Sequence, residues 1–393
     1  MMPGKRPSLR SVTLLLATAL AACEAGPTEP FEATRPEAVV LPTDTRLFVG
    51  DFVTCGTLDA GETYCWGETN AVGGLGIGHS WAAVPRPLSR DIRFAQVAPG
   101  HGHSCGLDTA GRAWCWGLND NGQLGDGTTT NHTEPRPVKS SRRFIAIDVG
   151  SHFTCAIADF GRIYCWGSNG SGQLGIGSTD ANRLTPSPIT SGFRDFTAVT
   201  TGSQHACALR SANRTYCWGA NSAGQLGRGT TSSPQRTPAR TDTRALATVS
   251  AGDLFTCGVA TTGGVFCWGQ NSFGQMGRGT TSANQLRPAQ VLGSSGFTDV
   301  AAGASHACAL DADGAPLCWG RNDRGQLGTG FGNVVAQPSP VIGSFQFVRI
   351  GAGSHSCGLR SNGSAVCWGQ TQLLGAGGMT STPSLATEVL SPF

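Results

Sequence analysis

Charged residues and long apolar segments are both scarce in this chain of 393 residues. Only 13% of the residues are charged, which argues against a disordered acidic or basic polymer. Only one segment is apolar enough to engage a membrane, and it lies at the very start. Glycine is abundant instead, at 57 residues without a collagen period, so we expect it in turns and at close backbone contacts.

The first 22 residues have the composition of an export signal. Lys5, Arg6 and Arg10 form a positive segment, and the apolar run at 12–20 is too short to cross a bilayer as a helix. The run ends in Leu-Ala-Ala-Cys at 20–23, which resembles the lipobox of bacterial lipoproteins. The resemblance implies cleavage before Cys23 and lipidation of that cysteine. An ordinary signal peptide that happens to precede a cysteine is the alternative.

Cleavage at this point would separate a signal peptide (1–22) from a lipidated, proline-rich tether (23–45) and a repeat region (46–393). We expect an exported protein held at the cell envelope by its lipid. By the same resemblance Glu24 favours the outer membrane, because an Asp at that position favours inner-membrane retention in proteobacterial lipoproteins. The removed segment carries three basic and no acidic residues, so 25 of each sign remain. This composition provides no basic patch for nucleic acid.

The other cysteines form a repeat. They fall into seven pairs with nine residues between the members of a pair, and Trp-Gly follows every second member. The pairs are Cys55 and Cys65, Cys105 and Cys115, Cys155 and Cys165, Cys207 and Cys217, Cys257 and Cys267, Cys308 and Cys318, and Cys357 and Cys367. Successive pairs lie 49 to 52 residues apart, a period typical of β-propeller blades. The sequence therefore predicts an all-β, seven-bladed propeller over 46–393.

Each cysteine pair is expected to form a disulfide across a hairpin, one in each blade. If Cys155 lies opposite Cys165, alternation puts both cysteines on one face of the sheet and Trp166 on the other. Directly opposed strand residues have Cα atoms within disulfide range. Each disulfide closes a small loop and should contribute roughly 2–3 kcal/mol. Zinc binding is the alternative, but nine intervening residues do not match the spacing of zinc ligands.

A second motif follows each Trp-Gly. One copy is Asn-Asp-Asn-Gly-Gln-Leu-Gly at 119–125, and further copies begin at Asn169, Asn221, Asn271 and Asn322. These motifs resemble the repeat of the regulator of chromosome condensation family, over about residues 45–390. The resemblance implies a seven-bladed ring and, for some members, a partner on one face. Members include exchange factors for a small nuclear GTPase, domains of ubiquitin ligases and secreted β-lactamase inhibitors, so the fold implies no single activity.

Three patterns could carry chemistry, and each has a structural alternative. Gly-His-Ser-Cys-Gly at 102–106 matches a nucleophile elbow, but it should enter a strand rather than a strand-to-helix turn. Asp311 to Gly314 could begin a calcium loop, but it is typical of an ordinary hairpin tip without further ligands. Four histidines precede the first cysteine of a pair by two residues: His103, His205, His306 and His355. Phe and Val fill this position elsewhere, so we expect packing and a hydrogen bond to a turn backbone rather than metal binding.

The loops that follow the second motif differ between repeats and carry residue types enriched at protein interfaces. The selected candidates are Trp81, Arg183, Arg236, Arg287 and Phe331. The resulting hypothesis is a monomeric, non-catalytic, lipid-anchored scaffold, without a cofactor, that binds a protein or a cell-envelope glycan. The alternatives are an enzyme or inhibitor using the propeller face, and a guanine nucleotide exchange factor by family analogy only. A tight group of acids or histidines at the channel would favour the enzyme, and the repeat pattern reveals none.

Overall fold

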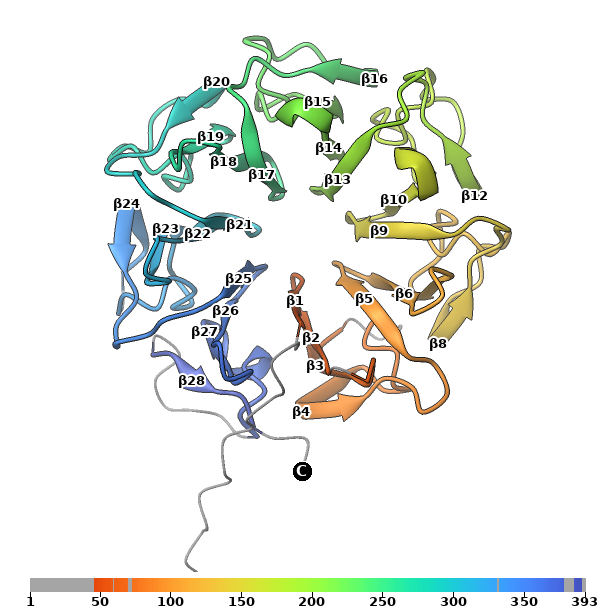
Figure 1. The fold of residues 1–393 in the computed structure, drawn as a ribbon, viewed down its shortest axis with the longest axis horizontal. Helices are drawn as coiled ribbons and strands as arrows, with labels where there is room; N and C mark the ends of the chain where they lie inside the picture. Colours follow the sequence, from red (N-terminus) through yellow and green to blue (C-terminus); the bar gives the residue numbers. More distant parts are fainter. Residues whose placement is uncertain (1–45, 59, 70–72, 331, 378–384, 391–393) are drawn as a thin grey trace, which may run out of the picture. The chain divides into compact units, whose positions relative to one another are not determined.

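The computed structural model describes residues 46–58, 60–69, 73–330, 332–377 and 385–390. These residues form seven four-stranded antiparallel sheets, or blades, arranged in a ring (Figure 1). The predicted signal peptide, Cys23, the tether and Phe331 lie outside the described residues. None of the short helical turns in the described part of the chain is long or apolar enough to span a bilayer.

The blades follow one another along the chain, and each contains four consecutive strands. Blade 1 contains β1 (Arg46–Val49), β2 (Val53–Thr57), β3 (Thr63–Glu68) and β4 (Trp81–Pro87); blade 2 contains β5 (Phe94–Pro99), β6 (His103–Asp108), β7 (Ala113–Gly117) and β8 (His132–Pro137); blade 3 contains β9 (Phe144–Val149), β10 (Phe153–Ala158), β11 (Arg162–Gly167) and β12 (Arg183–Pro188); blade 4 contains β13 (Phe196–Thr201), β14 (His205–Arg210), β15 (Arg214–Gly219) and β16 (Gln235–Arg240). Blade 5 contains β17 (Leu246–Ala251), β18 (Phe255–Ala260), β19 (Val265–Gly269) and β20 (Gln285–Gln290); blade 6 contains β21 (Asp299–Ala302), β22 (His306–Leu310), β23 (Pro316–Arg321) and β24 (Val334–Pro340); blade 7 contains β25 (Arg349–Ala352), β26 (Ser356–Leu359), β27 (Ala365–Trp368) and β28 (Thr387–Glu388). Three 3-10 turns complete the described elements: η1 (Asp159–Gly161), η2 (Ser211–Asn213) and η3 (Thr371–Leu373).

The second and third strands of each blade carry the cysteine pair in the predicted register. In blade 3, Cys155 lies opposite Cys165 and Thr154 lies opposite Trp166. All seven pairs form disulfides, with Cα–Cα distances of 4.0 to 4.1 Å. The bonds join Cys55 to Cys65, Cys105 to Cys115, Cys155 to Cys165, Cys207 to Cys217, Cys257 to Cys267, Cys308 to Cys318, and Cys357 to Cys367. The seven-bladed fold with one disulfide in each blade is therefore confirmed, and disulfides in this number are typical of an oxidising compartment.

The tryptophan that follows each cysteine pair packs between neighbouring blades. The indole Nε1 of Trp166 in blade 3 donates to the backbone oxygen of Gln123, which lies in the motif loop of blade 2, at 2.8 Å. The same bond recurs from Trp116, Trp218, Trp268 and Trp319 to the loop of the preceding blade. The next blade therefore packs on the Gly-Gln-Leu-Gly motif, which explains the repetition of this motif.

The antiparallel strand order gives the ring two different faces. Turns between the first and second strands and loops between the third and fourth strands emerge together, on what we call the loop face. Hairpins between the second and third strands, and the links to the next blade, emerge on the opposite side, the tip face. The last strand, β28, completes blade 7, and Val389 packs with Trp66 of blade 1. The ring closes by this packing.

Candidate functional site

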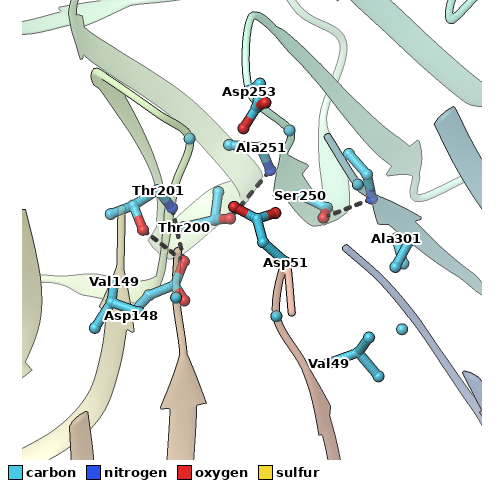
Figure 2. Close-up of a pocket in the computed structure, with 18 of the residues that line it drawn as sticks. Val49, Asp51, Asp148, Val149, Thr200, Thr201, Ser250, Ala251, Asp253 and Ala301 are labelled. Atoms are coloured by element: carbon cyan, nitrogen blue, oxygen red, sulfur yellow. Dashed lines mark hydrogen bonds between the residues drawn. The ribbon is translucent and has the colours of Figure 1, made fainter. Parts of the chain in front are cut away.

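The mouth of the central channel is hollowed on the loop face. It is a cavity of about 310 Å³ on the axis of the propeller, lined by the inner strands and their turns from all seven blades (Figure 2). The lining includes acidic side chains at Asp51, Asp148, Asp253 and Asp299, with His101 beside them. The cavity therefore brings several titratable side chains together at one place.

A ring of glycines sets the width of this mouth. One glycine stands at the turn after the first strand of every blade: Gly50, Gly100, Gly150, Gly202, Gly252, Gly303 and Gly353. A Cβ atom on Gly252 would lie 2.3 Å from the carbonyl oxygen of Gly303 in the next blade. The same clash recurs between Gly202 and Gly252. These positions need glycine because the backbones of adjacent blades approach closely.

Hydrogen bonds between blades line one side of the cavity. Asp148 Oδ2 accepts from the backbone nitrogen of Thr201 at 2.7 Å and from its hydroxyl at 3.1 Å (Figure 2). Thr200 and Ser250 occupy the position of Asp148 in the next two blades, and their hydroxyls accept backbone N–H bonds from the following blade. Burial raises the pKa of Asp148 to about 6. This carboxyl group is thus part of the blade-to-blade framework.

Asp51, His101 and Asp253 form a group of titratable side chains at the mouth. His101 Nδ1 lies 3.2 Å from Asp51 Oδ2, and this hydrogen bond raises the pKa of His101 above its usual value. Burial, together with the nearby Asp51 carboxylate, raises the pKa of Asp253 to about 6. His101 and Asp253 can exchange protons near neutral pH, and the acidic pair can receive a cationic group. No set of three potential ligand residues is placed to hold a metal ion within the described ranges.

The expectation that the channel holds no group of acids and histidines was therefore wrong. The sequence did contain a signal for this group, because each of its members directly follows one of the seven ring glycines. The residues at that position are Asp51, His101, Ser151, Ser203, Asp253, Ala304 and Ser354. Residues that are scattered along the chain in this way converge on the axis only when the ring closes.

The four repeated histidines lie between blades. His103 Nε2 contacts Thr154 Oγ1 of the next blade at 2.9 Å, and that hydroxyl donates to the backbone oxygen of Gln123. The histidine must therefore be the donor, as a neutral Nε2–H tautomer. His205, His306 and His355 make the same contact to Thr256, Ser356 and Thr54. The expected bond to a turn backbone was wrong, since the partner is a side-chain hydroxyl.

Burial dominates the ionisation of these histidines. It lowers the pKa of His103, His205 and His306 to about 3, and that of His355 to about 4. The Nδ1 atoms of three of them, His103, His205 and His355, are buried without a hydrogen-bond partner. These rings are therefore neutral near pH 7, and their place in the interior explains why they do not serve as a channel-facing set.

The two remaining patterns have structural roles. Ser104 lies buried in β6, and its hydroxyl donates to the backbone oxygen of Gly74 at 2.8 Å. It is therefore in a strand and not on a nucleophile elbow. Asp311 Oδ1 accepts from the backbone nitrogens of Asp313 and Ala315, at 3.0 and 2.8 Å. This carboxylate closes the hairpin turn, as expected from the sequence.

The structure places the predicted binding residues on outer strands of four blades and does not bring them together. Trp81 begins β4 and is 55% exposed, and Arg183 begins β12. Arg236 lies exposed in β16. Arg287 in β20 forms an ion pair with Asp242, so its guanidinium is engaged. Their common location is the outer rim of the ring, away from the channel mouth.

Although the overall charge is nearly balanced, arginines recur on the tip face of blades 2, 3 and 4. Arg112, Arg162 and Arg214 follow the hairpin tip in these three blades, whereas Gly264, Ala315 and Ser364 take this position in blades 5 to 7. Composition averages over the whole surface and conceals such a local concentration.

Fold and site together define a disulfide-bonded, seven-bladed propeller with an acidic channel mouth. The chain belongs to the family described as RCC1-like domain, whose model matches residues 62–390. No curated protein matches the chain by sequence.

Several solved structures share the fold. Yeast RCC1 (Prp20) bound to Kap60 has a TM-score of 0.75 and 20% identity, over 96% of this chain and 92% of that chain. Human WBSCR16 has a TM-score of 0.70 and 21% identity, over 80% and 86%. The ectodomain of the Arabidopsis thaliana receptor kinase ACR4 has a TM-score of 0.54 and 18% identity, over 88% and 98%. At these identities the likeness shows the fold alone.

Proposed function

We propose that this protein is an exported, lipid-anchored scaffold that binds a protein or a cell-envelope glycan through its loop face and catalyses no reaction. The observation that carries the proposal is the acidic cavity at the channel mouth, formed by the inner strands and their turns on the loop face. A partner that places a group in the cavity and extends across the loop face can also contact the outer rim of the ring. Trp81, Arg183 and Arg236 supply aromatic and guanidinium groups on that rim.

The acidic side chains at the mouth favour a partner that presents a cationic group there. Asp51 and Asp253 lie close together at the mouth (Figure 2), and Asp253 is half-buried. A lysine, arginine or amino-sugar nitrogen would favour the charged form of Asp253 and gain a charge-assisted hydrogen bond. We therefore place the centre of the interface at the mouth, with the predicted rim residues around it.

A crosslinking pull-down from intact envelopes tests the proposal with two loop-face variants. One variant replaces Trp81, Arg183, Arg236, Arg287 and Phe331 with Ala, and the other combines Asp51→Asn with Asp253→Asn. Both should lose the partner recovered with the parent. The melting temperature of the rim variant should stay within a few degrees of the parent, because exposed side chains contribute little stability.

A tip-face variant provides the matched control. Asp313→Ala with Ser361→Ala changes exposed hairpin residues on the opposite side and should retain the partner. Loss of the partner in this control, together with full binding by both loop-face variants, would show that the wrong face was chosen.

The channel group also favours one second candidate, an enzyme acting at the mouth. The His101–Asp51 pair beside Asp253 has the proton-exchange capacity that general acid–base catalysis needs. Turnover of an envelope substrate that disappears in Asp51→Asn would favour this candidate over the scaffold. Guanine nucleotide exchange has no specific observation in its support, since it rests on analogy alone.

A further inference from the structure

An arc of arginines on the tip face has no role in the proposed loop-face binding. Arg142 and Arg143 lie in the link before β9, Arg162 begins β11, and Arg194 lies in the link before β13. Arg142, Arg143 and Arg194 are exposed. Within the described residues these four side chains take part in no ion pair. These four guanidinium groups are therefore not engaged in ion pairs within the described part of the fold, although the exposed Asp159 lies beside Arg143.

Phe160 stands in the middle of this arc. It is 86% exposed at the tip of η1, with a left-handed backbone conformation (φ 65°) that bulky side chains disfavour. Its neighbours place it among the arginines, because the backbone nitrogen of Asp159 donates to the oxygen of Arg143 at 3.2 Å. Gly161 abuts the backbone of Arg194 on the other side. Neither local conformation nor packing requires an aromatic side chain here.

The corresponding tip residue in other blades is small or polar. Ala110, Ala212, Thr262, Asp313 and Asn362 take the position of Phe160 in blades 2, 4, 5, 6 and 7. Two of the arginines are also held in place, since the Cζ atoms of Arg142 and Arg162 lie 4.6 and 5.6 Å from the ring centre of Tyr164. An exposed apolar tip between oriented guanidinium groups fits a surface that is anionic outside and apolar beneath.

The position of the chain's entry into the ring favours a lipid surface as the occupant. Arg46 begins β1, which runs from the tip face to the turn at Gly50, so the chain enters blade 1 on the tip face. A lipid on Cys23, upstream of this entry point, would therefore be joined to the ring from the tip-face side. This orientation rests on the proposed anchor, whereas the chemistry of the arc does not.

We propose that the tip face of blades 2 to 4 docks onto an anionic membrane, with Phe160 inserted among the headgroups and Arg142, Arg143, Arg162 and Arg194 contacting lipid phosphates. Guanidinium groups bind phosphate through paired hydrogen bonds, and an aromatic ring gains free energy in the interfacial layer. Docking in this orientation leaves the loop face and its channel mouth turned outward, available to a partner.

Flotation with lipid vesicles tests the docking without the anchor. The probe protein runs from Glu24 to Phe393 and retains the tether region and every described strand. It should float with vesicles of phosphatidylglycerol and phosphatidylcholine, and not with phosphatidylcholine alone. Arg142→Gln with Arg143→Gln should lower vesicle partitioning about 30-fold, since each juxtamembrane arginine contributes about fivefold. Phe160→Ala should lower it about tenfold.

A matched pair of loop-face arginines controls for net charge. Arg236→Gln with Arg278→Gln removes two exposed charges from the opposite face and should leave partitioning unchanged. An equal loss in this control, or equal binding to both vesicle compositions, would overturn the proposal. So would binding to polyglutamate or duplex DNA without binding to vesicles, because the arc would then serve an acidic macromolecule.

The failure of the docking can be told apart from the failure of the anchor. If the protein purified from membranes carries lipid on Cys23 and the probe protein ignores anionic vesicles, the docking is wrong and the anchor stands. If the probe protein binds anionic vesicles and mass spectrometry finds no lipid on Cys23, the anchor is wrong and the docking stands.

Discussion

Mild acid should destabilise the propeller through the histidines between its blades. Each ring donates from Nε2 to a hydroxyl of the next blade, and protonation would place a charge on a buried Nδ1 atom. The folded state therefore binds fewer protons than the unfolded chain. The resulting stability is fully present above pH 6.5 and is lost as the pH falls towards the folded pKa of about 3.

The size of the effect follows from the pKa difference. The unfolded histidine has a pKa of 6.5, and the folded one has a pKa of about 3. At pH 5 this difference lowers the free energy of unfolding by about 2 kcal/mol for each histidine. The four histidines together lose about 8 kcal/mol. Asp148 and Asp253 act in the opposite direction, because their raised pKa lets the folded state take up protons, and they offset about 2–3 kcal/mol. The net loss at pH 5 is thus about 5 kcal/mol.

Two blade borders without histidine show which substitutions could remove one histidine from the pH dependence. Phe153 packs with Ala206, and Phe255 packs with Ala307, at the positions where four other borders pair histidine with Ser or Thr. His205→Phe with Thr256→Ala would copy this apolar pair. Urea denaturation followed by tryptophan fluorescence at pH 7 and pH 5 should show that this variant loses about 2 kcal/mol less than the parent. An identical pH dependence of parent and variant would refute the reasoning.

Three further outcomes are expected. Cys23→Ser should make the protein extractable from membranes by high salt, because only the salt-sensitive docking of the arginine arc would remain; attachment that resists high salt would contradict the lipid anchor. Denaturing, non-reducing mass analysis with peptide mapping should find seven disulfides that join only the two cysteines of each hairpin, and links between blades would contradict the fold. Gly252→Ala should lower the free energy of unfolding by about 2 kcal/mol or more, because its Cβ would meet the Gly303 carbonyl. Gly170 has open space around it, so Gly170→Ala should stay within about 0.5 kcal/mol of the parent. Equal effects of the two substitutions would refute the close-approach argument.

The blades could be predicted because their signals are local. Nine residues between Cys155 and Cys165 fix a hairpin of one length, and the register then follows from alternation. Repetition along the chain gives the number of blades. The disulfides, the position of Trp166 and the roles of Ser104 and Asp311 all follow from the same short-range geometry.

The channel group could not be found in this way because it is not local. Asp51 and Asp253 belong to blades 1 and 5, and only the curvature of the closed ring brings them to one axis. The partner of His103 was missed for a related reason, since Thr154 lies one full repeat away. Aligning the repeats by position would have identified the first group, because its members follow the glycines of the ring.

The pairing between blades also limits how such a ring can change during evolution. A blade with histidine in this position is followed by one with Ser or Thr, as His205 is by Thr256, and a blade with phenylalanine is followed by one with Ala. Duplicating or exchanging a whole blade would separate two residues that match across its border. A mismatch would leave a buried hydroxyl beside a phenyl ring, or a histidine without its acceptor. At the six borders that carry histidine or phenylalanine, the unit that has to be inherited intact is therefore the border between two blades; the border after blade 1, with Val53 and Ser104, departs from this pairing.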